Sequence, residues 1–142
     1  ATRQEVCAEV FAAVSTAFFE LDEFYSSLDE LQGLSHLEDP AAKGWVMSDF
    51  GDTYASRKAA TEAVRKNALF LSAESTAAGN AAVATLKEIW ETMSDDYEQG
   101  ILASRGVMND AELRIEQLKS ALWADLAVMS KDRPAEGVAT RP

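Results

Sequence analysis

Apolar side chains in the first thirty residues follow the alternating four-three spacing that constrains this chain most strongly. Residues three and four apart lie on the same side of an α-helix, so this spacing places them on one helical stripe. The stripe consists of Cys7, Phe11, Val14, Phe18, Leu21, Tyr25 and Leu28, and Val10, Ala17, Phe24 and Leu31 widen it by one row. We therefore predict a helix from about residue 3 to about residue 33, ending at Gly33.

Three later segments repeat this pattern with different regularity. Two stripes are regular: Val83, Leu86, Trp90, Met93, Tyr97 and Ile101, and then Ala111, Ile115, Leu118, Leu122, Leu126 and Met129. A third stripe, in which Arg57 and Asn67 intrude, comprises Phe50, Tyr54, Thr61, Val64, Ala68, Leu71 and Ser75. The pattern indicates four amphipathic helices in all.

Residues 34–47 read as the connection between the first two helices. Pro40 lacks an amide hydrogen and disfavours helical geometry at the preceding Asp39. Ser48, Asp49 or Asp52 would then cap the second helix.

Glycine and asparagine mark the other expected boundaries. Gly79 and Asn80 tolerate positive φ and predict a turn, although the neighbouring alanines would also allow one helix to run straight through. Gly106 is expected to close the third helix, and Asn109 to cap the fourth, with Glu112 reaching back as in a capping box.

Four helices joined by short connections predict an all-α, antiparallel up-down-up-down four-helix bundle. We expect residues 1–131 to form this single domain and residues 132–142 a short extended C-terminal tail. Glycine (7) and proline (3) are scarce, and the hydrophobic fraction of 47% is typical of a globular chain. The tail, RPAEGVATRP after Asp132, has almost nothing to bury and would be mobile on its own.

The net charge of −11 is concentrated near the N-terminus. Residues 1–40 contain nine acids and one base, a charge of −8, which leaves −3 for the rest of the chain. Nucleic acids and anionic membranes are bound through clustered Lys and Arg, so neither is expected as a partner. No run reaches the roughly 18 apolar residues of a membrane span. The N-terminus does not resemble a signal peptide, and Ala1 fits removal of an initiator methionine, which favours a cytoplasmic location.

Catalytic and metal-binding motifs are not evident. Phosphate-binding glycine motifs are absent, and the single Cys7 lies among apolar residues, which is typical of a buried side chain. Di-iron bundles need paired histidines, and acids in the SDDYEQG stretch lack the spacing of a calcium loop. We therefore expect no cofactor, no metal and no enzymatic activity.

His36 is the only histidine and invites comparison with histidine-phosphotransfer bundles. In those domains the histidine lies within a helix and is followed by a lysine-glycine pair. Here the Lys43-Gly44 pair comes too late, and Pro40 interrupts the segment. Histidine phosphotransfer is therefore kept as a third hypothesis for the function, after the two that are given below.

Phe19 is a candidate partner-binding residue because it lies almost opposite the apolar stripe of its helix. Isolated aromatics within a polar rim are typical anchors of protein interfaces. The acids around it on the helical wheel are Glu9, Glu23 and Glu30. The alternative is a lone exposed hydrophobic residue of no functional consequence.

Two further surfaces are candidates for protein contact. Ala55, Ala59, Ala63 and Phe70 form a second apolar side of the second helix, which favours either a central position in the bundle or contact with another subunit. The tail from Arg133 and Pro134 would be ordered only if a neighbour held it.

The sequence thus predicts a non-enzymatic structural or interaction protein, a subunit of a homo-oligomer or of a larger assembly such as a phage or virion complex. A cytoplasmic or virion location follows from this interpretation. The main alternative is an acidic inhibitor that imitates the charge of a nucleic acid, motivated by the acidic first forty residues.

Overall fold

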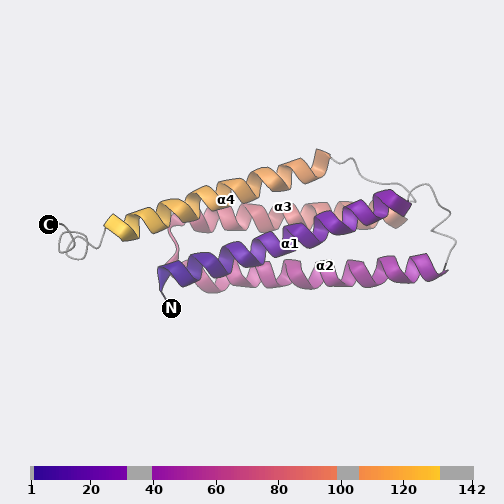
Figure 1. Cartoon of the computed structure of the whole chain (residues 1–142), viewed down its shortest axis with the longest axis horizontal. Coiled ribbons are helices and arrows are strands. Elements are labelled where there is room, and N and C mark those ends of the chain that lie inside the picture. Colours follow the sequence, from indigo (N-terminus) through magenta and orange to yellow (C-terminus); the bar gives the residue numbers. More distant parts are fainter. Residues whose placement is uncertain (1, 32–39, 99–105, 132–142) are drawn as a thin grey trace.

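The computed structural model is an antiparallel bundle of four long helices (Figure 1). The helices are α1 (Arg3–Leu31), α2 (Pro40–Asn67), α3 (Ala73–Glu98) and α4 (Gly106–Lys131), and a 3-10 turn, η1 (Ala68–Phe70), follows α2. The structure describes residues 2–31, 40–98 and 106–131, and these ranges contain no strand. The predicted all-α, up-down-up-down bundle is therefore confirmed, while the expected tail, residues 132–142, lies outside the described residues.

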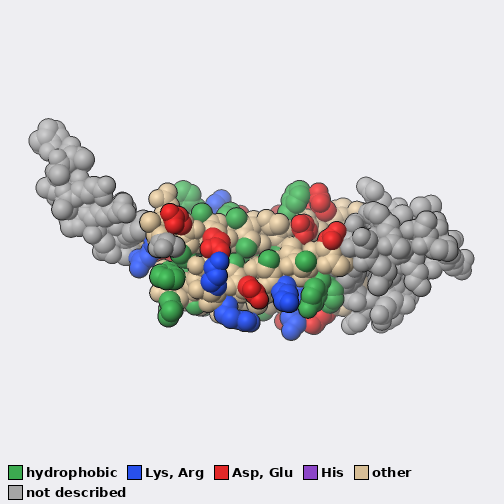
Figure 2. Space-filling view, turned by 90° about the horizontal axis from the view of Figure 1, so that it is seen from below, with side chains coloured by type: hydrophobic (Ala, Val, Ile, Leu, Met, Phe, Trp, Pro, Cys, Tyr) green, Lys and Arg blue, Asp and Glu red, His purple; other side chains and the backbone are tan. Residues whose placement is uncertain are grey.

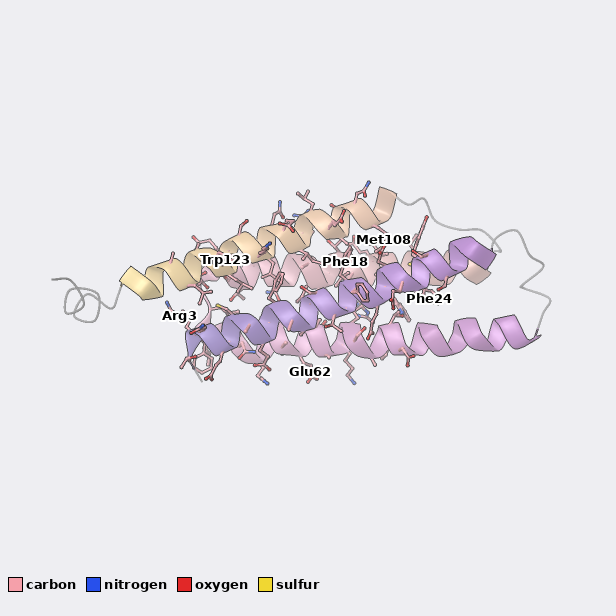
Figure 3. The ribbon with its side chains drawn as sticks, viewed as in Figure 1. Arg3, Phe18, Phe24, Glu62, Met108 and Trp123 are labelled. Atoms are coloured by element: carbon pink, nitrogen blue, oxygen red, sulfur yellow. The ribbon has the colours of Figure 1, made fainter. Side chains whose placement is uncertain are left out.

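All four helices contribute to one hydrophobic core. α1 packs mainly on α2 and α3 on α4, while contacts between α1 and α4 and between α2 and α3 close the bundle. Figure 3 shows Phe18 and Phe24 of α1 and Met108 of α4 in the half of the bundle where α1 ends and α4 begins. Burial of these apolar faces is the main force that holds the helices together.

The apolar stripe expected on α1 faces the core as predicted where its side chains are described, with Phe11 and Phe18 partly buried. Cys7, Val14 and Leu21, one heptad apart, are each almost completely buried, and Val10, Ala17 and Phe24 form the second buried row. The expected stop at Gly33 lies outside the described residues, and α1 ends at Leu31.

A capping box starts α1. The Glu5 backbone N–H donates to the Thr2 hydroxyl over 3.1 Å, and the Thr2 N–H donates to the Glu5 carboxylate over 3.3 Å. These bonds satisfy two amides that would otherwise lack partners at the helix start.

The expected connection over residues 34–47 is too long, because α2 begins at Pro40. Proline is favoured in the first turn of a helix, where its missing N–H has no partner to lose. The proposed caps Ser48, Asp49 and Asp52 consequently lie inside α2.

The turn expected at Gly79 and Asn80 is also wrong, since both residues lie within α3. The chain turns instead at η1 and Leu71, whose extended backbone (φ −108°, ψ 155°) ends the helical run. Ser72 then caps α3, its hydroxyl accepting the Ser75 N–H over 3.1 Å.

Gly79 serves helix packing rather than a turn. A β-carbon at this position would lie 3.1 Å from both Cγ atoms of Val64 in α2. The glycine therefore allows α2 and α3 to approach closely at this level.

The buried stripe of α2 differs from the predicted one by about one row. Thr53, Ala60 and Asn67 are buried, whereas Tyr54 is exposed. Polar side chains occupy two of these buried positions because each finds a hydrogen-bond partner inside the bundle, which a count of apolar residues does not anticipate.

The boundary before α4 is also displaced from the expected one. Gly106 is the first residue of α4 rather than the end of the preceding helix, and Asn109 lies within the first turns of α4 instead of capping it. The face expected on this helix is confirmed, since Ala111, Leu118 and Leu122 are buried.

Candidate interaction surface

Phe19 projects from α1 with 61% of its surface exposed. It lines a shallow recess of about 560 Å³ on the same helix, together with Ser15, Thr16, Phe18, Glu20 and Glu23. The neighbouring Phe18 packs against the core instead. The structure thus presents an aromatic ring within a polar and acidic rim, as expected from the sequence.

Glu9, one of the acids predicted to surround Phe19, is engaged within the bundle. Its carboxylate lies 2.6 Å from the Lys66 ammonium and accepts a 3.3 Å hydrogen bond from the Asn67 amide, both on α2. Hydrogen bonds from Lys66, and secondarily from Asn67, lower the pKa of Glu9 below its ordinary value. Glu9 therefore joins α1 to α2.

The remaining predicted acids have different surroundings. Glu23 is exposed and lies beside Phe19, as its position on the helical wheel suggested. The side chain of Glu30 lies outside the described part of the chain.

A groove of about 910 Å³ runs between α1 and α2 near the end of α1. Its lining combines carboxylates with hydroxyl groups: Glu20, Asp22, Glu23, Asp52, Ser26, Ser27, Thr53 and Ser56, with Phe24 and Ala55. The acidic lining favours cationic groups over anions by simple attraction.

The second predicted surface, on α2, is divided by the structure. Ala59 is exposed, but Ala63 is only 7% exposed, which agrees with the alternative that this side of α2 faces neighbours within its own bundle. α2 lies between α1 and α3, and its own neighbours therefore cover a wide stripe of this helix.

Phe70 is 49% exposed and lies in η1 beside Leu69, which is 94% exposed. None of the η1 residues is buried, so the corner between α2 and α3 carries two adjacent exposed hydrophobic side chains. The third predicted surface, Arg133 and Pro134, lies outside the described residues.

Sequence reasoning missed several exposed hydrophobic residues. Trp123, on α4 in Figure 3, is 65% exposed, and Leu113 on the same helix is more than half exposed. Both lie off the stripe formed by Ala111, Leu118 and Leu122, so a helical wheel of α4 contained the signal. Leu69 was not recognisable in this way, because its exposure depends on where α2 ends.

An aromatic and cationic cluster joins α2 to α3. The Trp90 indole N–H donates to the buried Thr53 hydroxyl over 3.0 Å. The Arg57 guanidinium lies 5.1 Å from the centre of the Tyr54 ring and 5.3 Å from that of Trp90. The cation over these two rings explains how Arg57 is accommodated within the α2 pattern.

Asp125 of α4 is 6% exposed and holds the α2–α3 corner. Its carboxylate accepts the Ser72 backbone N–H over 3.1 Å. Burial raises the pKa of Asp125, but hydrogen bonds from the Ser72 hydroxyl and N–H, together with the Arg3 charge, outweigh it and leave the pKa below its ordinary value. The carboxylate thus remains charged and fixes the residue that caps α3.

Cys7, the single cysteine, lies in the core rather than at the surface. Burial raises the pKa of the Cys7 thiol, and the negative charge of Asp125 raises it further, which makes this thiol a poor nucleophile. His36 lies outside the described residues. Among those described, no three His, Cys, Asp or Glu side chains are placed to hold a metal ion.

Within the described ranges, none of the helices has the length and apolar character needed to cross a membrane.

No protein-family model, curated protein or solved structure is significantly similar to this chain.

Proposed function

We propose that this chain is a non-enzymatic helical bundle that works through protein–protein contact, as a subunit of a homo-oligomer or of a larger assembly. The observation that carries the proposal is the set of large hydrophobic side chains left exposed by a bundle that buries its core well. These are Phe19, Tyr54, Leu69, Phe70, Leu113 and Trp123. Aromatic side chains of this kind are the commonest anchors of protein interfaces.

The exposed hydrophobic residues are distributed over several elements. Phe19 lies on α1, Leu69 and Phe70 at the α2–α3 corner, and Trp123 on α4. A subunit that contacts more than one neighbour needs separate surfaces of this type. A cytoplasmic protein complex or a virion would be a suitable setting for such a subunit.

Light scattering coupled to size-exclusion chromatography tests this proposal. The full chain is compared over a hundredfold range of concentration at low and high salt. A defined oligomer that persists at high salt supports assembly through apolar contacts. A monomer under all conditions contradicts self-assembly and leaves only a different protein as partner.

The acidic groove between α1 and α2 favours a second candidate function, inhibition of a nucleic-acid-binding protein by charge mimicry. Glu20, Glu23 and Asp52 gather there. Figure 2, which views the molecule from below, shows Lys and Arg side chains interspersed with Asp and Glu, so this side of the molecule is not uniformly acidic. A mimic complex should weaken steeply between low and moderate salt, whereas an apolar assembly should not.

A further inference from the structure

The outward sides of α1 and α2 form one surface with opposite charges on its two halves. We define it as the α1–α2 face, comprising the exposed and half-buried outward side chains of residues 9–23 on α1 and 55–66 on α2. Residues 9–23 contain four acids and no base, whereas α2 contributes three bases, Lys58, Arg65 and Lys66, and one acid, Glu62. Glu9 and Lys66 pair with each other within the chain, and Arg57 faces α3, so Glu20 and Glu23 on α1 and Lys58 and Arg65 on α2 remain for a partner. Figure 3 shows Glu62 pointing away from the bundle below α2.

The register between the two helices is defined at both ends of this face. Glu9 pairs with Lys66 at one end, and Glu20 and Glu23 share the groove with Thr53 at the other. Both helices rise about 1.5 Å per residue, so Phe19 lies at the level of residues 55–59 of α2. At this level α2 exposes two small side chains, Ala55 and Ala59, and the ammonium group of Lys58.

We infer that the α1–α2 face is a self-association surface on which a second copy of this chain docks about a two-fold axis parallel to the helices. This inference rests on the proposed function and names its partner. Rotation about such an axis leaves every residue at its own level and places α1 of each copy on α2 of the other. The acidic half of each face then meets the basic half of its partner.

The same rotation places each Phe19 ring against the small side chains of the other copy. Ala55 and Ala59 leave room for an aromatic ring that a larger side chain would exclude. Both copies make this contact, because a two-fold interface repeats each interaction. Two buried aromatic anchors within a rim of opposite charges form the arrangement expected of a specific interface.

Charge selects this axis over the alternative two-fold arrangement. An axis in the same plane but perpendicular to the helices would place α1 on α1 and α2 on α2. Glu20 and Glu23 would then face the same acids of the other copy, and Lys58 and Arg65 would face the same bases. Like charges at close range oppose association, so only the parallel axis uses the charge distribution of this face.

Sedimentation velocity on the full chain tests the inference, with the dissociation constant of the dimer as readout. We expect Phe19→Ser to raise this constant at least about tenfold, since it removes both aromatic anchors. Trp123→Ser is the matched control, because it removes a similarly exposed aromatic residue from α4 and should change the constant less than about twofold.

A charge exchange tests the axis itself. Lys58→Glu and Glu20→Lys should each weaken the dimer, and the variant carrying both should recover most of the lost affinity, because each new lysine meets a new glutamate of the other copy. Far-UV circular dichroism of each variant verifies that the bundle is folded. A perpendicular axis predicts no such recovery.

Two outcomes overturn the inference and are distinguishable from each other. A dimer that resists Phe19→Ser but is lost with Trp123→Ser excludes the α1–α2 face and leaves self-assembly, the proposed function, intact. A chain that remains monomeric at all concentrations excludes self-association itself.

Discussion

Single polar residues decide how the corner between α2 and α3 is built. Asp125 accepts the N–H of Ser72, and the Ser72 hydroxyl in turn accepts the N–H of Ser75. A buried carboxylate is tolerated here because backbone and hydroxyl donors replace the water that it loses. One acid on α4 thereby fixes the start of α3.

We expect Asp125→Ala to lower the free energy of unfolding by about 1–3 kcal/mol, because the partly buried Ser72 N–H loses its acceptor. Urea denaturation followed by circular dichroism measures the change. Glu116→Ala, which removes an exposed carboxylate from the same helix, should have little effect. Equal losses in the two variants would contradict a structural role for Asp125.

The stability that Asp125 provides should depend on pH. Its pKa in the folded protein is lower than the ordinary value of 3.8. The contribution is therefore complete above that ordinary value and is lost as the pH falls through the lower folded pKa. Repeating the urea experiment between about pH 7 and about pH 2 should show a smaller acid-induced loss for Asp125→Ala than for the unmodified chain.

Cys7 should react slowly with thiol reagents in the folded protein. Its side chain is buried, and the raised pKa keeps the thiol protonated at neutral pH. Modification by an aromatic disulfide, followed by absorbance, should be slow in buffer and rapid in denaturing urea. Equal rates in the two solutions would show that Cys7, in the N-terminal half of α1, is accessible to the reagent in the folded protein.

At the scale of the elements, close helix approach depends on where small residues lie. Gly51 and Gly79 both lie within helices, but only Gly79 has a neighbouring helix against it, at Val64. Glycine lowers helix stability in either place. Its presence in α3 is explained by packing, and its presence at position 51 has no packing explanation.

The two glycines should therefore respond differently to the same substitution. Gly51→Ala should raise the free energy of unfolding by about 0.5–1 kcal/mol, because alanine is the better helix former and no atom obstructs it. Gly79→Ala should be less stable than Gly51→Ala by about 1–3 kcal/mol, because its new methyl group meets the branched Val64 side chain. Thermal or urea denaturation of both variants measures this difference, and similar values would show that the α2–α3 contact is loose.

At the scale of the whole molecule, all four helices share one core. The buried cluster includes Val14 of α1, Val64 of α2, Leu86 of α3 and Leu118 of α4. A defect in any helix is therefore expected to weaken all four, as in a cooperative two-state transition.

Leu118→Ala should lower the free energy of unfolding by about 2–5 kcal/mol, because it leaves a cavity where the side chain was completely buried. Leu113→Ala on the same helix is the control and should change stability by less than about 0.5 kcal/mol. Tryptophan fluorescence and far-UV circular dichroism should report the same transition in each variant. Separate transitions would contradict a single shared core.

The amino-acid sequence by itself determined the helical class, the number of helices and the buried faces of α1 and α4. Regular four-three spacing gathers the apolar residues on one face of a helix, and burial of that face is favourable. The buried stripe through Cys7, Val14 and Leu21 could therefore be assigned without coordinates. The exposure of Phe19 follows from the same argument, because it lies opposite that stripe.

Only the tertiary structure decided where α2 ends, which row of α2 is buried and which surface residues have internal partners. Gly79 permits a turn and also permits close packing, and the proximity of Val64 selects packing. Glu9 lies on the exposed side of α1, and only the structure shows that it pairs with Lys66 of α2. In each case the burial or pairing of a side chain depends on contacts between residues far apart in the chain. The spacing of apolar residues along one helix does not show which side chains of the neighbouring helices lie opposite it.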